Sequence, residues 1–195
     1  MKIFKVFIPV FMSLVLLLGV FQPVIDVSEE ISQKVLRLHI LANSDSTEDQ
    51  NLKIGVKNYI LENTKDLFSG KTLEENIKIA QENTEYLHSL ASEYVHKQGY
   101  DYDINVSVVR EFFETRVYDD FTLPAGEYNS LKIEIGEGNG HNWWCIIFPS
   151  VCLSACSESI DDYLTEEEMS LVKSGYTPKF KIIEIYEKIS QKLNK

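Results

Sequence analysis

A cysteine and a histidine are the residues of this chain best suited to covalent chemistry. His141 and Cys145 are four positions apart, and a thiolate beside an imidazole base is the pair that cysteine hydrolases use. On an extended strand, residues four apart share one face but lie about 13 Å from each other, too far for direct proton transfer. Cys145 also lies within an apolar run, where a thiol is inert or oxidised. A Cys-His hydrolase is therefore an alternative only, and we expect no catalytic residue.

Histidines and carboxylates could also bind a metal ion. His39 with Asp45, or His39 with His141, would be the candidate ligands, but no spacing in the chain matches a zinc or calcium site. We therefore expect no metal and no other cofactor. Arg37, His39 and Asp45 are instead expected to form a polar cluster at the end of a short strand. In that cluster Asp45 would pair with Arg37 or cap the following helix.

Three glycines alternate from Gly136 to Gly140, directly before both tryptophans. Glycine accepts positive φ and lets another segment approach closely, and a simple hairpin needs only one or two of them. A phosphate-binding loop is not expected, because such loops open a helix whereas a strand follows here. Trp143 and Trp144 beside this loop have the composition of a surface that recognises another protein. The alternative is that at least one tryptophan belongs to the core.

The N-terminal segment indicates export. Lys2 and Lys5 precede about 20 uncharged residues, rich in Val, Leu, Ile and Phe, that end at Asp26. Such a run suits a signal peptide, and it is also long enough for a membrane anchor. We expect residues 1–25 to be one or the other, and residues 26–195 to form a single extracytoplasmic domain.

The acidic balance of the chain narrows its partners. The net charge is −11, and loss of Lys2 and Lys5 with a signal peptide would leave −13. Nucleic acid is excluded as a partner, because the chain has no basic stripe that could neutralise phosphates. The acidity suits a soluble protein held off an anionic membrane surface.

The cysteines lie in one short stretch, at Cys145, Cys152 and Cys156. In an exported protein a disulfide is expected, and an odd count leaves one thiol free or paired between chains. Cys145 with Cys152 is the preferred pair, because the intervening Pro149 can turn the chain back. Cys152 with Cys156 is the competing pair.

Four segments have the residue pattern of strands: 35–41, 102–108, 131–135 and 143–148. The first three alternate apolar and polar residues, as half-buried strands do. The last is apolar throughout, which predicts a central strand covered on both faces. The glycine-rich loop joins the last two strands, so we expect them to form a hairpin.

Four helical segments are indicated, beginning at Thr47, Thr72, Thr165 and Thr177. Glu75 and Glu168 stand three residues after two of these threonines, which is the spacing of a capping box. The second segment is expected to run unbroken to Gly99. The apolar side of the last helix is expected to consist of Ile182, Tyr186, Ile189 and Leu193. This order predicts an α+β fold, with a small, largely antiparallel sheet and helices packed mainly on one face.

Three segments resemble the stage II sporulation protein R family. They are Arg37–Ser46 with Asp49-Gln50, Leu123–Tyr128, and Gly136 through Phe148-Pro149 to Cys152. The family-like part covers about residues 35–156. The helices at 160–195 match no family motif and are expected to form a C-terminal extension. The chain departs from the family pattern where Phe113 is followed by Glu114.

The resemblance implies a signal and not an enzyme. Such proteins are secreted from the forespore into the space between forespore and mother cell. There they activate a membrane-embedded aspartic-type protease, which processes the precursor of sigma-E in the mother cell. Residues 1–25 would give transient or anchored membrane association. A membrane-anchored structural or interaction domain is the further alternative.

Residues that match the family pattern are the candidates for partner binding. They are Arg37, His39, Asn43, Asp45, Tyr128, Gly136, Gly138, Asn142, Trp143 and Trp144, with Cys145 and Cys152 as the disulfide candidates. Ser44, Pro124, Gly126, Phe148 and Pro149 also match the pattern.

Overall fold

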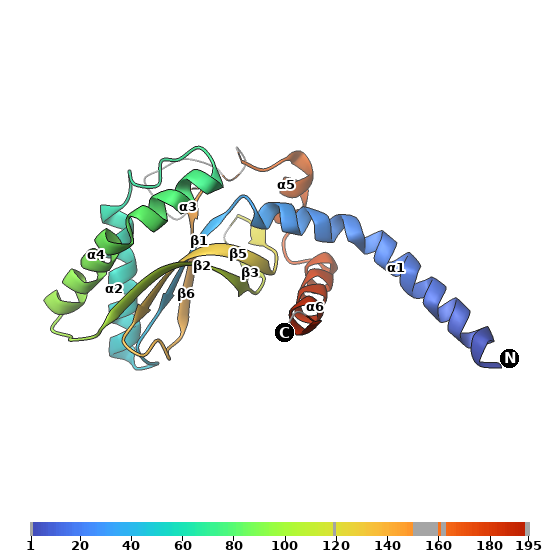
Figure 1. Cartoon of the computed structure of the whole chain (residues 1–195), viewed down its shortest axis with the longest axis horizontal. Helices are drawn as coiled ribbons and strands as arrows, with labels where there is room; N and C mark the ends of the chain where they lie inside the picture. Colours follow the sequence, from blue (N-terminus) through green and yellow to red (C-terminus); the bar gives the residue numbers. More distant parts are fainter. Residues whose placement is uncertain (1, 119, 150–159, 161–162, 194–195) are drawn as a thin grey trace. The chain divides into compact units, whose positions relative to one another are not determined.

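The computed structural model describes residues 2–118, 120–149, 160 and 163–193. The chain divides into two compact units (Figure 1). The sheet unit comprises Ser32–Glu111 and Glu127–Leu164, and the helical unit comprises Met1–Ile31, Phe112–Gly126 and Thr165–Lys195. The candidate residues for partner binding all belong to the sheet unit.

The sheet unit is built on four strands in the order β2-β5-β1-β6. Their bounds are β1 Leu36–Leu41, β2 Ile104–Phe113, β5 Gly126–Ile135 and β6 Asn142–Phe148. β1 runs parallel to β5 and antiparallel to β6, so the sheet is mixed. The predicted α+β class is confirmed.

The predicted hairpin of the last two strands is wrong. β1 lies between β5 and β6, with Leu38 opposite both Leu131 and Cys145. β6 is thus an edge strand and not the central strand that its apolar run predicted. The short β1 takes the central place because its residues up to Ile40 are all buried, polar ones included. Hydrophobic alternation alone had assigned β1 a wet face.

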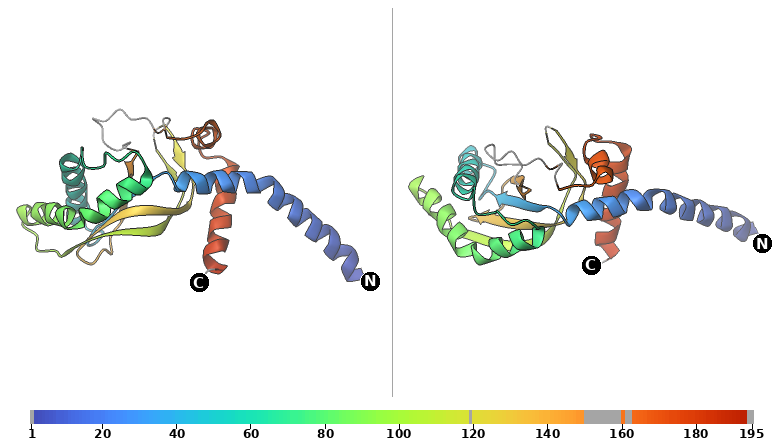
Figure 2. Two further views of the ribbon diagram at one scale, coloured as in Figure 1. Left: turned by 45° about the horizontal axis from the view of Figure 1, so that its top comes forward. Right: turned by 90° about the horizontal axis from the view of Figure 1, so that it is seen from above.

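Three helices, α2 (Thr47–Asn63), α3 (Leu73–Glu82) and α4 (Thr84–Lys97), supply the layer that packs on the sheet (Figure 2). Their buried residues share one core cluster with residues of β1 and β5: Leu36, Leu38, Ile40, Leu52, Val56, Ile60, Ala80, Leu87, Ala91, Val95, Leu131 and Ile133. α2 packs closely on α4, because a Cβ at Gly55 would lie 2.2 Å from the hydroxyl of Tyr94. The helix predicted to run unbroken to Gly99 is interrupted at Asn83, whose side chain donates to the carbonyl of Ile79.

The helical unit contains α1 (Lys2–Ser32), the strands β3 (Arg116–Val117) and β4 (Thr122–Leu123), α5 (Glu166–Val172) and α6 (Pro178–Leu193). The strands β3 and β4 pair antiparallel. Thr165 and Glu168 form the predicted capping box at the start of α5. Among the residues described, none of the helices has the length and apolarity that crossing a membrane requires.

The apolar side predicted for the last helix is wrong. α6 buries Phe180, Ile183 and Glu187, whereas Ile189 and Leu193 of the predicted side are exposed. At 100° per residue the centres of the buried and predicted sides lie about 120° apart around the helix. Phe180 and Ile183 are fully buried, so their side of the helix is the one that packs in the fold.

Candidate functional site

The glycine-rich loop, residues 136–141, crosses the end of β1 to connect β5 with β6. It is held on the segment that follows β1 by backbone bonds from Gly140 N to Ala42 O (2.9 Å) and from Asn139 N to Asn43 O (3.2 Å). Glu137 N also donates to the side-chain oxygen of Asn43 (3.0 Å). The first and third family-like segments are therefore joined into one structure, which we call the clasp (residues 42–49 and 136–141).

The glycines of the clasp are required by close approach. A Cβ at Gly140 would lie 2.2 Å from the backbone oxygen of Ser44, and a Cβ at Gly136 would lie 2.3 Å from the side-chain oxygen of Asn43. Gly136 and Gly138 also have φ of +58° and +63°, which residues with a Cβ rarely adopt. Only at Gly138 is there room, since its nearest neighbours are 3.8 Å away. The loop is thus a fitted connection.

Asp49 is the buried centre of the clasp. Its carboxylate accepts from Asn43 Nδ2 (2.9 Å) and Ser44 Oγ (2.6 Å), and the side chain is 4 % exposed. Burial raises the pKa of Asp49, but the hydrogen bonds from Ser44, Asn43 and Tyr102 outweigh it and hold the pKa below its usual value. Asp49 stands near the N-terminus of α2, where a negative charge is favoured.

Lys53 ties α2 to the loop. Its ammonium donates to the carbonyl of His141 (2.7 Å) and to Gln50 Oε1 (2.6 Å), and the residue is 3 % exposed. Burial lowers the pKa of Lys53, with the charge of Asp45 acting in the opposite direction. Because its ammonium is hydrogen-bonded on both sides, the buried lysine holds the end of the loop against α2.

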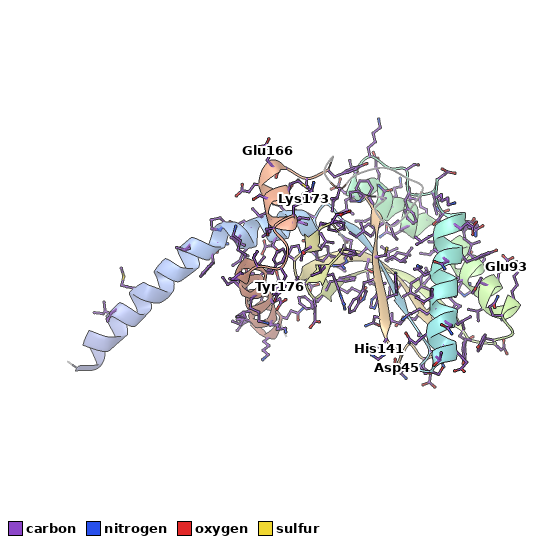
Figure 3. All side chains as sticks on the ribbon, turned by 180° about the vertical axis from the view of Figure 1, so that it is seen from behind. Asp45, Glu93, His141, Glu166, Lys173 and Tyr176 are labelled. Carbon is purple, nitrogen blue, oxygen red and sulfur yellow. The ribbon has the colours of Figure 1, made fainter. Side chains whose placement is uncertain are left out.

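The outer side of the clasp is exposed and polar. His141 donates its backbone N–H to Asp45 Oδ1 (2.6 Å), and its ring Nδ1 also meets this oxygen (2.5 Å). These hydrogen bonds lower the pKa of Asp45. Figure 3 shows the two side chains next to each other at one end of the sheet. The predicted pairing of Asp45 with Arg37, or its capping of the helix, is wrong, since Ser46 caps α2.

The two tryptophans of β6 have different surroundings. Trp143 is 36 % exposed, and the ammonium of Lys57 lies 4.5 Å from the centre of its ring. Trp144 is half-buried, with its ring 5.7 Å from that of His39. From Cys145 onward the strand is buried. The exposed part of β6 is therefore Asn142 and Trp143, directly beside the clasp.

Arg37, His39 and Tyr128 lie on the other face of the sheet from the helices. Arg37 and Tyr128 are fully buried, with the guanidinium 4.9 Å from the centre of the tyrosine ring. His39 Nδ1 meets Glu111 Oε1 at 2.9 Å. Burial raises the pKa of Glu111, but the hydrogen bond and charge of His39 outweigh it and lower that pKa. Arg37 and His39 thus share one face of β1, whereas Asp45 lies in the clasp, so the three do not form the predicted cluster.

The geometry gives the Cys-His hydrolase no support. Cys145 is buried in the apolar part of β6, where a thiol is inert as a nucleophile or oxidised. His141 points outward and meets Asp45. Cys152 and Cys156 lie outside the described residues, so the preferred Cys145–Cys152 pair and the competing Cys152–Cys156 pair both stay predictions. No group of three or more metal-ligating side chains occurs within the described part of the chain.

The sequence of the chain matches a known protein family. The family model for stage II sporulation protein R matches residues 32–158. The chain belongs to this family. It is also 32 % identical to stage II sporulation protein R of Bacillus subtilis (strain 168) over 168 residues, which cover 81 % of this chain and 71 % of that protein. No solved structure matches the chain.

Membership of the family supports a signalling role in sporulation for this protein. The matched range includes the whole clasp. Helices α5 and α6 lie beyond it. The sequence-predicted residues Asn43, Asp45, Gly136, Gly138 and Asn142 come together at this end of the sheet. Arg37 and Tyr128 instead pack in its interior.

Four residues of the site were not predicted as site residues from the sequence: Asp49, Lys53, Lys57 and Glu111. Lys53 could have been found, because it follows Leu52 on the side of α2 that also carries Val56, where a lysine is unusual. Glu111 had no comparable signal, since its partner His39 is 72 residues away.

The sheet unit of this protein also has a cavity of about 550 Å³. Three cationic side chains, Lys34, Lys71 and Arg110, line it together with Phe148 and Tyr163. The two aromatic rings meet edge to face at 5.1 Å. No sequence pattern had pointed to this cavity.

Replacing Asp49 by Asn is expected to destabilise this protein by about 2 kcal/mol at neutral pH. The side-chain amide has a single acceptor oxygen, so it cannot accept hydrogen bonds from all three donors that the carboxylate serves. Urea unfolding of the purified protein measures this. A lowered folded-state pKa adds stability above the unfolded pKa that is lost as the pH falls through the folded value. The difference between wild type and variant should therefore shrink below about pH 4.

The matched control is Asp45→Asn, which changes an exposed carboxylate of the same clasp. Its effect should be much smaller than that of Asp49→Asn, because solvent screens an exposed ion pair. Equal effects of the two variants would contradict the central place given to Asp49.

Proposed function

We propose that this protein is an exported sporulation signal that activates a membrane-embedded aspartic-type protease. The protease then processes the precursor of sigma-E in the mother cell. Membership of the stage II sporulation protein R family carries the proposal, because it supports a signalling role in sporulation. The protein acts as an activator and supplies no catalytic group of its own.

The surface that we propose for protease contact is the outer side of the clasp with the start of β6. Its exposed residues are Asp45, Asn139, His141, Asn142 and Trp143. A partly exposed tryptophan beside polar side chains is a common composition of interaction hot spots. The loop is also bonded to the segment after β1, so little conformational entropy would be lost on binding.

Activation by binding needs only a difference in affinity. A protease that exchanges between an inactive and an active state shifts toward the state that this surface binds better. Arg37, His39 and Tyr128 would then act from the interior, by holding β1 and β5 in the register that places the clasp.

Export would bring the surface to the protease. Residues 1–25 begin with two lysines and continue as an apolar run, which supports either a cleaved signal peptide or a retained anchor. The protein would then act in the space between forespore and mother cell. Transient or anchored membrane association through this segment is part of the proposal.

Co-expression in a bacterium that does not sporulate tests the proposal. Cells that make the protease, the sigma-E precursor and this protein should cleave the precursor, whereas cells without this protein should not. Immunoblotting of the precursor and its product measures cleavage. An inactive protease, with its catalytic aspartate replaced, is the control for background proteolysis.

The same assay separates the proposed surface from the fold. Trp143→Ala removes a ring that is partly exposed and meets Lys57, so it should weaken activation about 30-fold, in the range of interface tryptophans. Tyr86→Ala, an exposed aromatic on α4, is the matched control and should activate normally. Full cleavage with both variants would remove Trp143 from the contact surface.

A further inference from the structure

α6 carries apolar side chains on two opposite sides. One side is buried in the helical unit through Phe180 and Ile183, both 0 % exposed. On the other side Ile185, Ile189 and Leu193 are 51 %, 54 % and 80 % exposed. Their spacing of four residues places them one above the other along a single face. We call this row the α6 ridge.

The α6 ridge is larger than a scatter of exposed apolar residues. Ile182 and Tyr186 are half-buried on the same side, so the apolar surface continues beside the ridge. Contiguous apolar patches of this kind on a soluble protein mark an interaction site. The helix gains nothing for its own fold from this side, since the opposite side already packs in the helical unit.

Lysines border the ridge. Lys181, Lys188 and Lys192 project along one edge of it at 100° per residue, and all three are exposed. The two glutamates of α6 are less available: Glu184 accepts from Lys181 at 2.9 Å, and Glu187 is 8 % exposed. The helix therefore presents a positive border in a chain of net charge −11.

We propose that the α6 ridge docks on the surface of an anionic lipid bilayer. Ile185, Ile189 and Leu193 would enter the boundary between headgroups and acyl chains, and the lysines would meet lipid phosphates. Helices with an apolar row and a lysine border lie on membranes in this way. A groove on another protein fits less well, because lysine is depleted in protein–protein interfaces and the exposed residues of the ridge are all aliphatic.

This inference rests on the proposed function, because export is what brings α6 to a membrane. It deepens that function by giving the signal a second, reversible hold on the bilayer in which the protease is embedded. The hold is local and does not conflict with the acidic charge of the rest of the chain, because charges beyond the Debye length are screened.

Hydrogen–deuterium exchange of the full chain tests the proposal. The protein is mixed with vesicles of phosphatidylglycerol and phosphatidylcholine, or with vesicles of phosphatidylcholine alone. Amides of residues 185–193 should exchange at least about tenfold more slowly with the anionic vesicles than with the neutral ones. The N-terminal segment is present in both samples, so its own insertion does not produce the difference.

Three variants make the result decisive. Ile185→Ser/Ile189→Ser/Leu193→Ser should abolish the protection, and Lys188→Glu/Lys192→Glu should remove the preference for anionic vesicles. Tyr86→Ser/Val117→Ser changes exposed apolar residues elsewhere and should leave the protection unchanged. Circular dichroism checks that each variant remains helical.

Equal exchange with both kinds of vesicle, or protection that survives the triple serine variant, would overturn the proposal. Protection of α6 by the co-expressed protease in detergent, without vesicles, would assign the ridge to a protein partner instead. The vesicle assay contains neither protease nor precursor, so its failure leaves the cleavage result untouched.

Discussion

Sporulating cells that lack this protein are expected to accumulate the uncleaved precursor of sigma-E. The reason is that the proposed activation works by binding the active state of the protease, so without the activator the protease stays mostly in its inactive state. An immunoblot of the precursor through sporulation measures the effect. A second copy of the gene, with its export segment intact, should restore cleavage.

Two outcomes would contradict this expectation. Normal processing in the deletion strain would remove the protein from the pathway. Restoration by a copy without residues 1–25, which stays in the cytoplasm, would contradict export and leave activation standing. Secreted levels of each copy must be measured alongside, because a poorly folded protein fails in the same way as an inactive one.

The sequence singled out both segments of the clasp, but it did not predict that they meet. The glycine-rich loop and the residues after β1 stood out because of their composition, and both belong to the clasp. The strands on either side of the loop, β5 and β6, were expected to be neighbours in a hairpin, whereas β1 lies between them. Strand order depends on which apolar surfaces fit together at long range, and a hydrophobic run looks the same in a central and an edge strand.

The polar residues of the site show that local contacts can be predicted from the sequence and long-range contacts cannot. The helix start was predicted at Thr47, and the cap of this helix is a local contact, since Asp49 N donates to Ser46 Oγ three residues before it. The bonds from Lys53 to His141, and from His39 to Glu111, join residues 88 and 72 positions apart. No periodicity records such a contact, and its partners become visible only when the sheet has formed.

The two faces of α6 explain a different error. Its apolar residues occupy both sides, so periodicity could not decide which side is the core. The side that periodicity favoured shares Ile189 and Leu193 with the α6 ridge. An apolar face that stays exposed does not contribute to the packing of the helix. Its exposure fits the membrane contact that we propose for the α6 ridge.

Gly140→Ala is expected to destabilise the protein by about 3 kcal/mol or more, as overpacking against a fixed backbone does. A Cβ there would lie 2.2 Å from the backbone oxygen of Ser44 and 3.0 Å from the Cβ of Ala42, so the loop would have to leave the end of β1. The bond from Gly140 N to Ala42 O would break with it. Urea unfolding of the purified variant measures the loss.

Gly138→Ala is the matched control two residues away. Its φ of +63° makes a Cβ strained, but the nearest atoms are 3.8 Å distant, so it should lose only about 1–2 kcal/mol. Equal losses at the two positions would mean that the loop does not rest on Ser44. If the expected order holds, a signalling defect of Gly140→Ala reflects an opened clasp, whereas one of Trp143→Ala reflects a lost contact. The glycines would then shape the surface that the tryptophan presents.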